Sequence, residues 1–185
     1  MKLTPRTMLE LAEHEGIVTV AYKDTVGVLT WGIGVTDASG HKVARYKNNP
    51  QSIERCIEVA EWLMRTVYLP DVLEAFDGFE LSEHQLAAAL SFHYNTGAIK
   101  RATWVSDFRS GRVNRAKLSF MNWRKPPEIY KRRKAERDLF FDGKWTSDGK
   151  VLVYDKVTRW GMQPVNPRLV DIRQDVKRAI EKASA

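Results

Sequence analysis

The apolar positions of the first fifteen residues recur with a helical period. One stripe takes the positions i, i+3, i+4 and i+7, which are Met8, Leu11, Ala12 and Glu15. Thr4 is expected to cap this helix, because a hydroxyl followed by Pro5 at the first helical position is typical of a helix start. Gly16 is the expected stop. Glu15 is therefore predicted on the buried face of the last turn, where burial disfavours an ionised carboxylate.

Residues 17 to 36 change to a strand pattern. They are rich in β-branched side chains and are interrupted by a turn near Asp24. Beyond the turn the pattern alternates, and the face expected to be buried carries Leu29, Trp31, Ile33 and Val35. The opposite face carries Val28, Thr30, Gly32 and Gly34. This second face is nearly bare apart from Thr30, as expected where a ligand approaches the backbone closely.

After a polar connection that ends near residue 50, the chain is predicted to be mostly helical. The first helical stripe comprises Ile53, Ile57, Ala60, Met64 and Val67. Ser82 and Gln85 form a capping box before a long helix that Gly97 is expected to end. Shorter helices are expected at 102–110, 114–123 and 127–141. A small hairpin around VLVY follows, and the stripe of a last helix near 167–182 comprises Leu169, Ile172, Val176 and Ile180.

The composition fits one domain with a sizeable core, since 43% of the 185 residues are hydrophobic. No apolar run approaches the length of a membrane span, and the start lacks the features of a secretory signal. Cys56 is the single cysteine and is expected to be a small core residue. Val18 stands where the zinc motif H-E-x-x-H needs its second histidine, so we expect no metal site. We also expect no cofactor.

The chain carries a formal net charge of +7, and part of this excess is concentrated between Arg124 and Arg137. Seven basic side chains stand there against two acidic ones, a local net of +5 (7 − 2). Such a surface attracts polyanions, and nucleic acid, an anionic cell-wall polymer and lipopolysaccharide are all candidates. The cluster is expected to be a solvated helix face.

Glu15 and Asp24 lie nine positions apart and in unlike predicted surroundings. Cleavage of a glycosidic bond needs two such carboxyl groups, one protonated to donate to the leaving oxygen and one ionised. Glu15 on the apolar stripe suits the acid, and Asp24 in a polar turn suits the base. Thr30 on the open face could hold the attacking water by a hydrogen bond.

A wider pattern surrounds these three residues, E-G-x5-Y-x-D-x-x-G-x-x-T-x-G-x-G-x-T. It resembles the active-site segment of the phage-T4-type lysozymes, glycoside hydrolase family 24. The segments LSEHQLAAALSFHYNTGA and YKRRKAERDLFFDGKW are similar to two helices of the same family. Val35 departs from the pattern, because the family often has histidine there.

The resemblance implies an α+β, lysozyme-like fold with a small antiparallel sheet lobe, a larger helical lobe and the active-site cleft between them. Glu15 would be the general acid, Asp24 the base or electrostatic partner, and Thr30 the water-positioning residue. Substrate-contact positions fall on Tyr94, Asn95, Trp104, Gly32 and Gly34. The bond cut would be the β-1,4 link between N-acetylmuramic acid and N-acetylglucosamine of bacterial peptidoglycan.

The expected organisation is a single catalytic domain over residues 1–185. Within it we expect a β-rich lobe at 16–50, a helical lobe at 52–145 and a C-terminal extension at 146–185. The resemblance implies a monomeric endolysin that stays in the host cytoplasm until lysis and then acts in the periplasm or cell wall. It would need a holin-type permeabilising partner, could meet an anionic outer-membrane surface, and is not expected to bind nucleic acid.

Two other functions remain open at this point. A lytic transglycosylase on a related fold would release 1,6-anhydro products and would need no water held by Asp24 and Thr30. A non-catalytic basic protein that binds wall or nucleic acid would instead show tight, salt-sensitive binding to polyanions.

Overall fold

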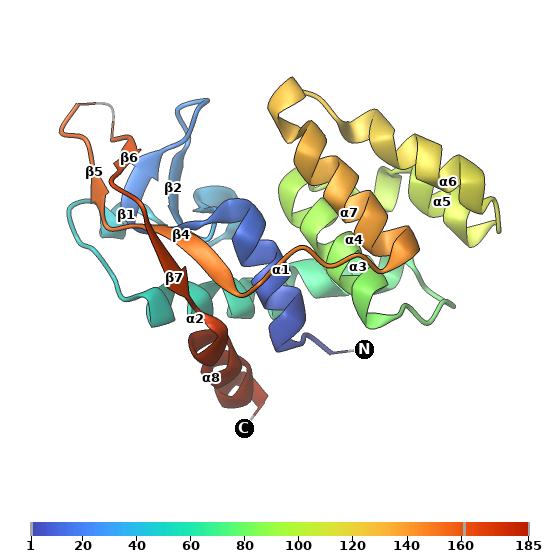
Figure 1. The fold of residues 1–185 in the computed structure, drawn as a ribbon, viewed down its shortest axis with the longest axis horizontal. Coiled ribbons are helices and arrows are strands. Elements are labelled where there is room, and N and C mark those ends of the chain that lie inside the picture. Colours follow the sequence, from blue (N-terminus) through green and yellow to red (C-terminus); the bar gives the residue numbers. More distant parts are fainter. Residues whose placement is uncertain (1, 161, 185) are drawn as a thin grey trace. The chain divides into compact units, whose positions relative to one another are not determined.

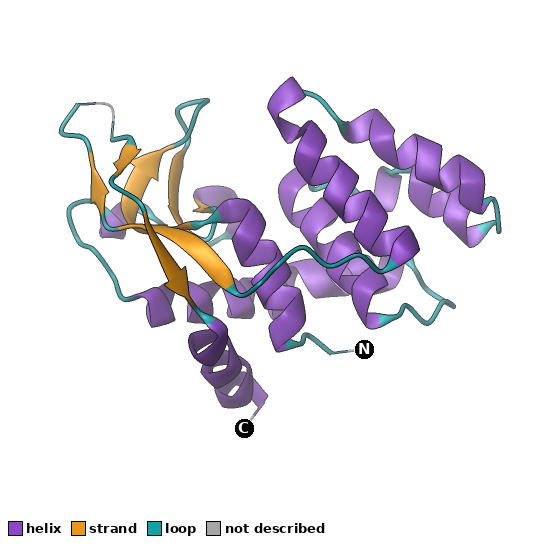
Figure 2. Ribbon diagram, viewed as in Figure 1, coloured by secondary structure: helices purple, strands orange, loops and turns teal. Residues whose placement is uncertain are grey.

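A computed structural model of the protein describes residues 2–160 and 162–184 (Figures 1 and 2). Two compact units divide the chain, and each is described separately. The sheet unit comprises Thr4–Leu63 and Ser147–Ala185, and the helical unit comprises Met64–Thr146 with Met1–Leu3. The segment from Ser147 onward therefore belongs to the same unit as the N-terminal strands, whereas the sequence predicts a separate C-terminal extension.

The sheet unit begins with helix α1, Pro5–Glu15, which has the predicted ends. The side chain of Thr4 accepts a hydrogen bond from the amide of Thr7 at 3.2 Å, and Gly16 ends the helix with a φ of 66°. The predicted burial of Glu15 is wrong, since this side chain is partly exposed. The buried carboxylate is that of Glu10, whose Oε2 accepts from the amide of Ser147 at 3.1 Å. A segment far along the chain covers this side of α1, so the buried face extends beyond the predicted stripe.

The main sheet has five strands in the order β3-β2-β1-β4-β7. Their bounds are Ile17–Lys23 (β1), Leu29–Gly32 (β2), Val35–Thr36 (β3), Lys150–Tyr154 (β4) and Arg168–Asp171 (β7). β1 pairs antiparallel with β2 and parallel with β4, so the sheet is mixed where a purely antiparallel one was expected. A second, two-stranded sheet pairs β5, Lys156–Val157, with β6, Pro164–Val165.

The segment VLVY forms a strand as predicted, but its partners are not local. β4 pairs with β7 on one side and with β1, more than a hundred residues earlier, on the other. The last helix, α8, runs from Arg173 to Ser184, later than predicted, because Leu169 lies on β7 with 64% of its surface exposed. The buried apolar positions at this end are Ile172, Val176 and Ala179.

The face of β2 that was expected to be bare is covered at Thr30 and Gly32, whereas Val28 is exposed. The strand ends at Gly32, and the chain turns through Gly32 and Gly34, which have φ values of 64° and 67°. Helix α2, Ile53–Leu63, lies behind the turn, where a Cβ on Gly32 would stand 3.6 Å from the Cβ of Cys56. Cys56 is fully buried, as predicted, and it fills the space that the missing side chain leaves. The short 3-10 turns Asp37–Ser39 and Ala44–Tyr46 complete the connection to α2.

The helical unit contains the predicted long helix and the shorter predicted helices after it, together with a short helix at its start that the sequence did not predict. Their bounds are Leu69–Ala75 (α3), Glu83–Thr96 (α4), Thr103–Arg109 (α5), Val113–Phe120 (α6) and Tyr130–Asp142 (α7). Short 3-10 turns occupy Ile99–Arg101, Met121–Trp123 and Pro127–Ile129. The capping box of Ser82 and Gln85 is present, and Gly97 ends α4. A π-helical turn at Met64–Tyr68 shifts the earlier apolar stripe, which leaves Val67 exposed.

Across the described residues, no helix combines the length and hydropathy needed to cross a bilayer.

Candidate active site

Glu15 stands at the junction between α1 and β1. Gly16 has a φ of 66° and a ψ of −175°, a conformation that essentially only glycine adopts, and its amide still donates to the carbonyl of Ala12 at 2.8 Å. A Cβ on Gly16 would also lie 3.2 Å from the carbonyl oxygen of Leu152. This glycine lets the chain pass from the last turn of the helix directly into the sheet, and it places the Glu15 carboxyl at the start of β1.

Asp24 organises the turn between β1 and β2. One carboxylate oxygen, Oδ1, accepts from the amides of Val26 and Val28 at 3.0 and 2.8 Å. The backbone closes the same turn, because the amide of Gly27 donates to the Asp24 carbonyl at 3.0 Å. Such Asx interactions fix the carboxylate without help from another side chain. Oδ2 remains available to a water molecule or a substrate.

Thr30 lies on β2, directly opposite Tyr22 of β1 in the antiparallel register. Its side chain is 3% exposed, and Oγ1 donates to the carbonyl of Val28 at 3.1 Å. Because a hydroxyl has one donor and two acceptor positions, Thr30 can still accept a hydrogen bond.

Tyr22 is affected by the charges of both carboxylates, although it has no predicted role in the site. Burial, and then the negative charges of Glu15 and Asp24, raise the pKa of Tyr22 to about 12. Its hydroxyl is therefore within electrostatic reach of both carboxyl groups and keeps its proton throughout the neutral range. The sequence signal that could have identified Tyr22 is its position between Glu15 and Asp24, two residues before the second acid. The sheet unit thus places Tyr22, Asp24 and Thr30 at the turn end of the β1–β2 hairpin, while Glu15 precedes the other end of β1 and still acts electrostatically on the Tyr22 hydroxyl.

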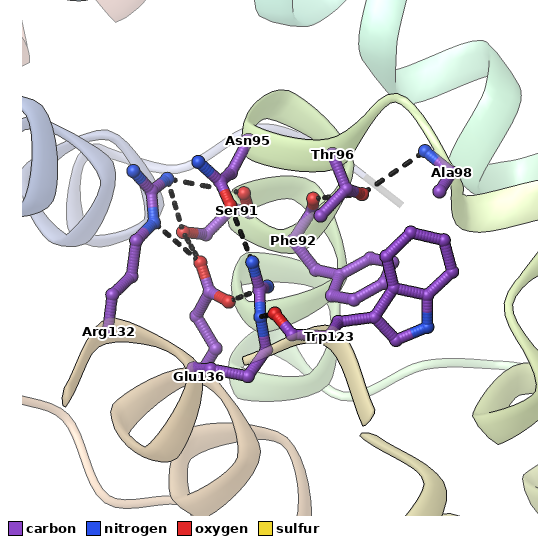
Figure 3. A network of polar contacts seen from close by, with 9 residues as sticks. Ser91, Phe92, Asn95, Thr96, Ala98, Trp123, Arg132 and Glu136 are labelled. Atoms are coloured by element: carbon purple, nitrogen blue, oxygen red, sulfur yellow. Dashed lines mark hydrogen bonds and ion pairs between the residues drawn. The ribbon is translucent and has the colours of Figure 1, made fainter. Parts of the chain in front are cut away.

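The other predicted contact residues belong to the helical unit, where a buried polar network joins α4 to α7 (Figure 3). Glu136 is fully buried and accepts from Ser91 Oγ at 2.6 Å and from Arg132 Nε at 2.8 Å. Arg133 also forms an ion pair with Glu136, and its Nε donates to the carbonyl of Trp123 at 3.0 Å. The expectation of a solvated basic face is wrong for these two arginines, because Glu136 pairs with both of them, and the carbonyls of Ser91 and Trp123 accept from Arg132 and Arg133 respectively.

Asn95 lies at the edge of this network. Its Oδ1 accepts from Arg133 Nη2, so the side-chain amide is oriented with its nitrogen free to donate to a ligand. A cavity of about 380 Å³ opens beside it, lined in part by Thr96, Trp123 and Arg133. Tyr94 is half-buried, with its ring centroid 4.8 Å from that of Tyr68. Both side chains therefore lie at the surface of the helical unit.

Trp104 does not qualify as a sugar contact. It has no exposed surface and sits in an aromatic core. Its ring lies 4.6 to 5.8 Å, centroid to centroid, from those of Phe76, Phe92, Phe120 and Phe140. Trp104 lies on the buried face of α5, so it contributes to the packing of the core.

Among the described side chains, no group of three histidine, cysteine, aspartate or glutamate residues is placed to hold a metal ion.

The sequence profile of the family described as phage lysozyme matches residues 12–136, which include Glu15, Tyr22, Asp24 and Thr30 of the sheet unit and Tyr94, Asn95 and Glu136 of the helical unit. The chain belongs to the phage lysozyme family. It is a glycoside hydrolase of the lysozyme type, which cleaves peptidoglycan. A search of curated proteins finds no match.

Solved structures of phage enzymes share the fold. A mutant of P22 lysozyme is 24% identical, with a TM-score of 0.62 over 76% of this chain and 98% of its own. The endolysin of Escherichia coli O157:H7 phage FAHEc1 is 19% identical, with a TM-score of 0.65 over 80% and 98%. The active form of the P1 phage endolysin Lyz is 17% identical, with a TM-score of 0.61 over 77% and 86%. The predicted lysozyme-like α+β fold is confirmed.

Proposed function

We propose that this phage lysozyme hydrolyses the β-1,4 bond between N-acetylmuramic acid and N-acetylglucosamine, with Glu15 as general acid and Asp24 as base. The observation that carries the proposal is the electrostatic effect of both carboxylates on the Tyr22 hydroxyl, opposite Thr30 on the neighbouring strand. Two carboxyl groups and a hydroxyl that can hold a water are the groups that glycoside hydrolysis uses.

The proposed reaction consumes one water. Glu15 donates its proton to the glycosidic oxygen while the bond from that oxygen to the anomeric carbon of N-acetylmuramic acid breaks. The water oxygen bonds to the same carbon from the opposite face, and Asp24 Oδ2 takes the proton that the water loses. Thr30 accepts a hydrogen bond from this water, since its own proton is donated to Val28. Afterwards Glu15 regains its proton from solvent and Asp24 releases one to it.

The roles of Tyr94 and Asn95 complete the proposal. Asn95 would donate its amide proton to an acyl or hydroxyl oxygen of the glycan, because Arg133 holds its own oxygen. The Tyr94 ring, supported by Tyr68, would offer a flat surface to a sugar. Gly32 and Gly34 leave the turn after Thr30 without side chains. The role of Gly32 is structural, because its backbone packs against Cys56.

Attack by water on the face opposite the leaving group inverts the anomeric configuration. We expect NMR spectra of an early digest to show the α-anomer of the new reducing end before mutarotation. An initial β-anomer would indicate a covalent intermediate and would overturn Asp24 as base.

A lytic transglycosylase is the alternative on the same fold. It would form a 1,6-anhydro ring without consuming water, so its products would be lighter by the mass of one water. The fixed Asp24 carboxylate and the acceptor on Thr30 favour hydrolysis. Mass spectrometry of digested walls distinguishes the two, and anhydro ends as the main product would replace our proposal.

Thr30→Val tests the water-positioning role. Valine has the same shape but no hydroxyl, and we expect the hydrolysis rate to fall by about tenfold to a hundredfold, the range expected when a reactant is misplaced. Thr30→Ser keeps the hydroxyl and is expected to retain most of the activity. Melting temperatures of both variants control for stability, because Thr30 is buried. Equal activity of Thr30→Val and the parent would remove Thr30 from the mechanism.

In the cell we propose that the enzyme acts as a monomeric endolysin. A separate membrane-permeabilising protein of the holin type would release it to the wall at lysis, where the basic surface would also meet anionic outer-membrane components. Expression of the enzyme alone should leave a culture turbid until the membrane is permeabilised, whereas co-expression with a holin should clear it. Clearing by the enzyme alone would show that it reaches the wall unaided.

A further inference from the structure

The described residues of the loop between β5 and β6 are hydrogen-bonded to one another. The Thr158 amide donates to the Gln163 carbonyl at 2.8 Å, and the Gln163 amide donates to Thr158 Oγ1 at 3.1 Å. The Thr158 hydroxyl in turn donates to the Trp160 carbonyl at 2.6 Å. These bonds close the loop at its base and hold the backbone of Trp160.

Trp160 presents its ring to solvent. Its exposed fraction is 82%, the largest among the large hydrophobic side chains that the structure describes, and the Arg159 guanidinium lies 5.4 Å from the ring centroid. A tryptophan in a defined loop that packs into no core contributes little to folding, and exposed aromatic surface of this kind is typical of binding sites.

The same loop is hydrogen-bonded to the residue that precedes Asp24. The Lys23 amide donates to the Met162 carbonyl at 3.1 Å, and Gln163 Nε2 donates to the Lys23 carbonyl at 3.0 Å. Figure 1 shows the β5–β6 hairpin beside β1, at the edge of β1 opposite β2. The Asp24 turn itself exposes 80% of Val26. The loop that carries Arg159 and Trp160 is thus hydrogen-bonded to the residue before one proposed catalytic carboxylate.

We propose that Trp160 is a glycan-binding residue, whose ring stacks on an N-acetylated sugar of the peptidoglycan strand outside the bond that is cut. Tryptophan offers a flat apolar face to the C–H groups of a pyranose, while Arg159 is placed to pair with carboxylates of the peptide stems. This subsite rests on the proposed function, because the role of Asp24 locates the reacting bond. The loop lies outside the residues that the family profile matches, so it is a feature of this chain's C-terminal segment.

Retention on purified, insoluble peptidoglycan tests the proposal without turnover. In the Glu15→Gln background, we expect Trp160→Ala to raise the Kd for sedimented walls about tenfold, or about 1.4 kcal/mol. Trp160→Phe keeps an aromatic face and should retain most of the binding. Leu169→Ala is the matched control, because it removes an exposed apolar side chain of the same unit from another element and should leave binding unchanged.

In the active enzyme, Trp160→Ala is expected to raise KM for long glycan strands more than it lowers kcat. Equal retention of Trp160→Ala and its parent would overturn the subsite. So would a loss of binding only to anionic lipid vesicles, because the loop would then be a membrane contact. Failure of the proposed function has a different signature, namely wall clearing by the Glu15→Gln variant, whatever the Trp160 variants retain.

Discussion

Glu15→Gln is expected to reduce wall hydrolysis by about a hundredfold to ten-thousandfold, the usual contribution of a general acid. Glutamine has nearly the same shape and can still form hydrogen bonds, but it has no proton to give to the glycosidic oxygen. Because Glu15 is partly exposed at the end of α1, the change leaves the packing of the helix intact. The measurement is the rate of turbidity loss of outer-membrane-stripped bacteria, wild type beside variant.

Two controls make this result specific. The melting temperature of Glu15→Gln should match that of the parent, which separates lost chemistry from lost structure. Glu13→Gln changes an exposed carboxylate on the same helix and should leave the rate unchanged. Wall clearing by Glu15→Gln at the parental rate would remove Glu15 from the reaction.

Glu136→Ala is expected to give the largest loss of stability. Glu136 is fully buried and neutralises Arg132 and Arg133, the second of which has no exposed surface. Breaking a buried ion pair by removing one partner costs about 3–5 kcal/mol, because a buried charge is left uncompensated. The Ser91 hydroxyl would lose its acceptor as well.

Urea unfolding of Glu136→Ala measures this loss as a lower midpoint at an unchanged slope. Glu128→Ala is the control, because Glu128 is an exposed acid shortly before the same helix and should shift the midpoint little. A loss under about 1 kcal/mol for Glu136→Ala would mean that water or backbone groups replace the carboxylate, and that the network is not a main source of stability.

The network around Glu136 also positions Asn95, the proposed substrate contact. Arg133 is held by Glu136 and in turn orients the Asn95 amide. Any folded Glu136 variant should therefore also bind glycan more weakly, which would appear as a raised KM.

The sequence by itself determined the elements whose signals are local. The helix start at Thr4, the capping box at Ser82 and the stop at Gly97 each depend on residues within one or two turns, and the structure has all three. The family motif around Glu15 likewise lies within one short stretch, so it could be recognised without knowledge of the remaining chain.

Only the tertiary structure decided which surfaces are covered and by what. Glu10 rather than Glu15 is buried in α1, Trp104 is a core residue, and Arg133 lies inside the helical unit. β1 takes β4 as a parallel neighbour from far along the chain. The physical reason is that the spacing of apolar residues shows which side chains share a face of a helix or strand. Whether that face is buried depends on the segment that packs against it. That partner comes from segments many residues away, and their hydrogen bonds and contacts exist only once the chain has folded.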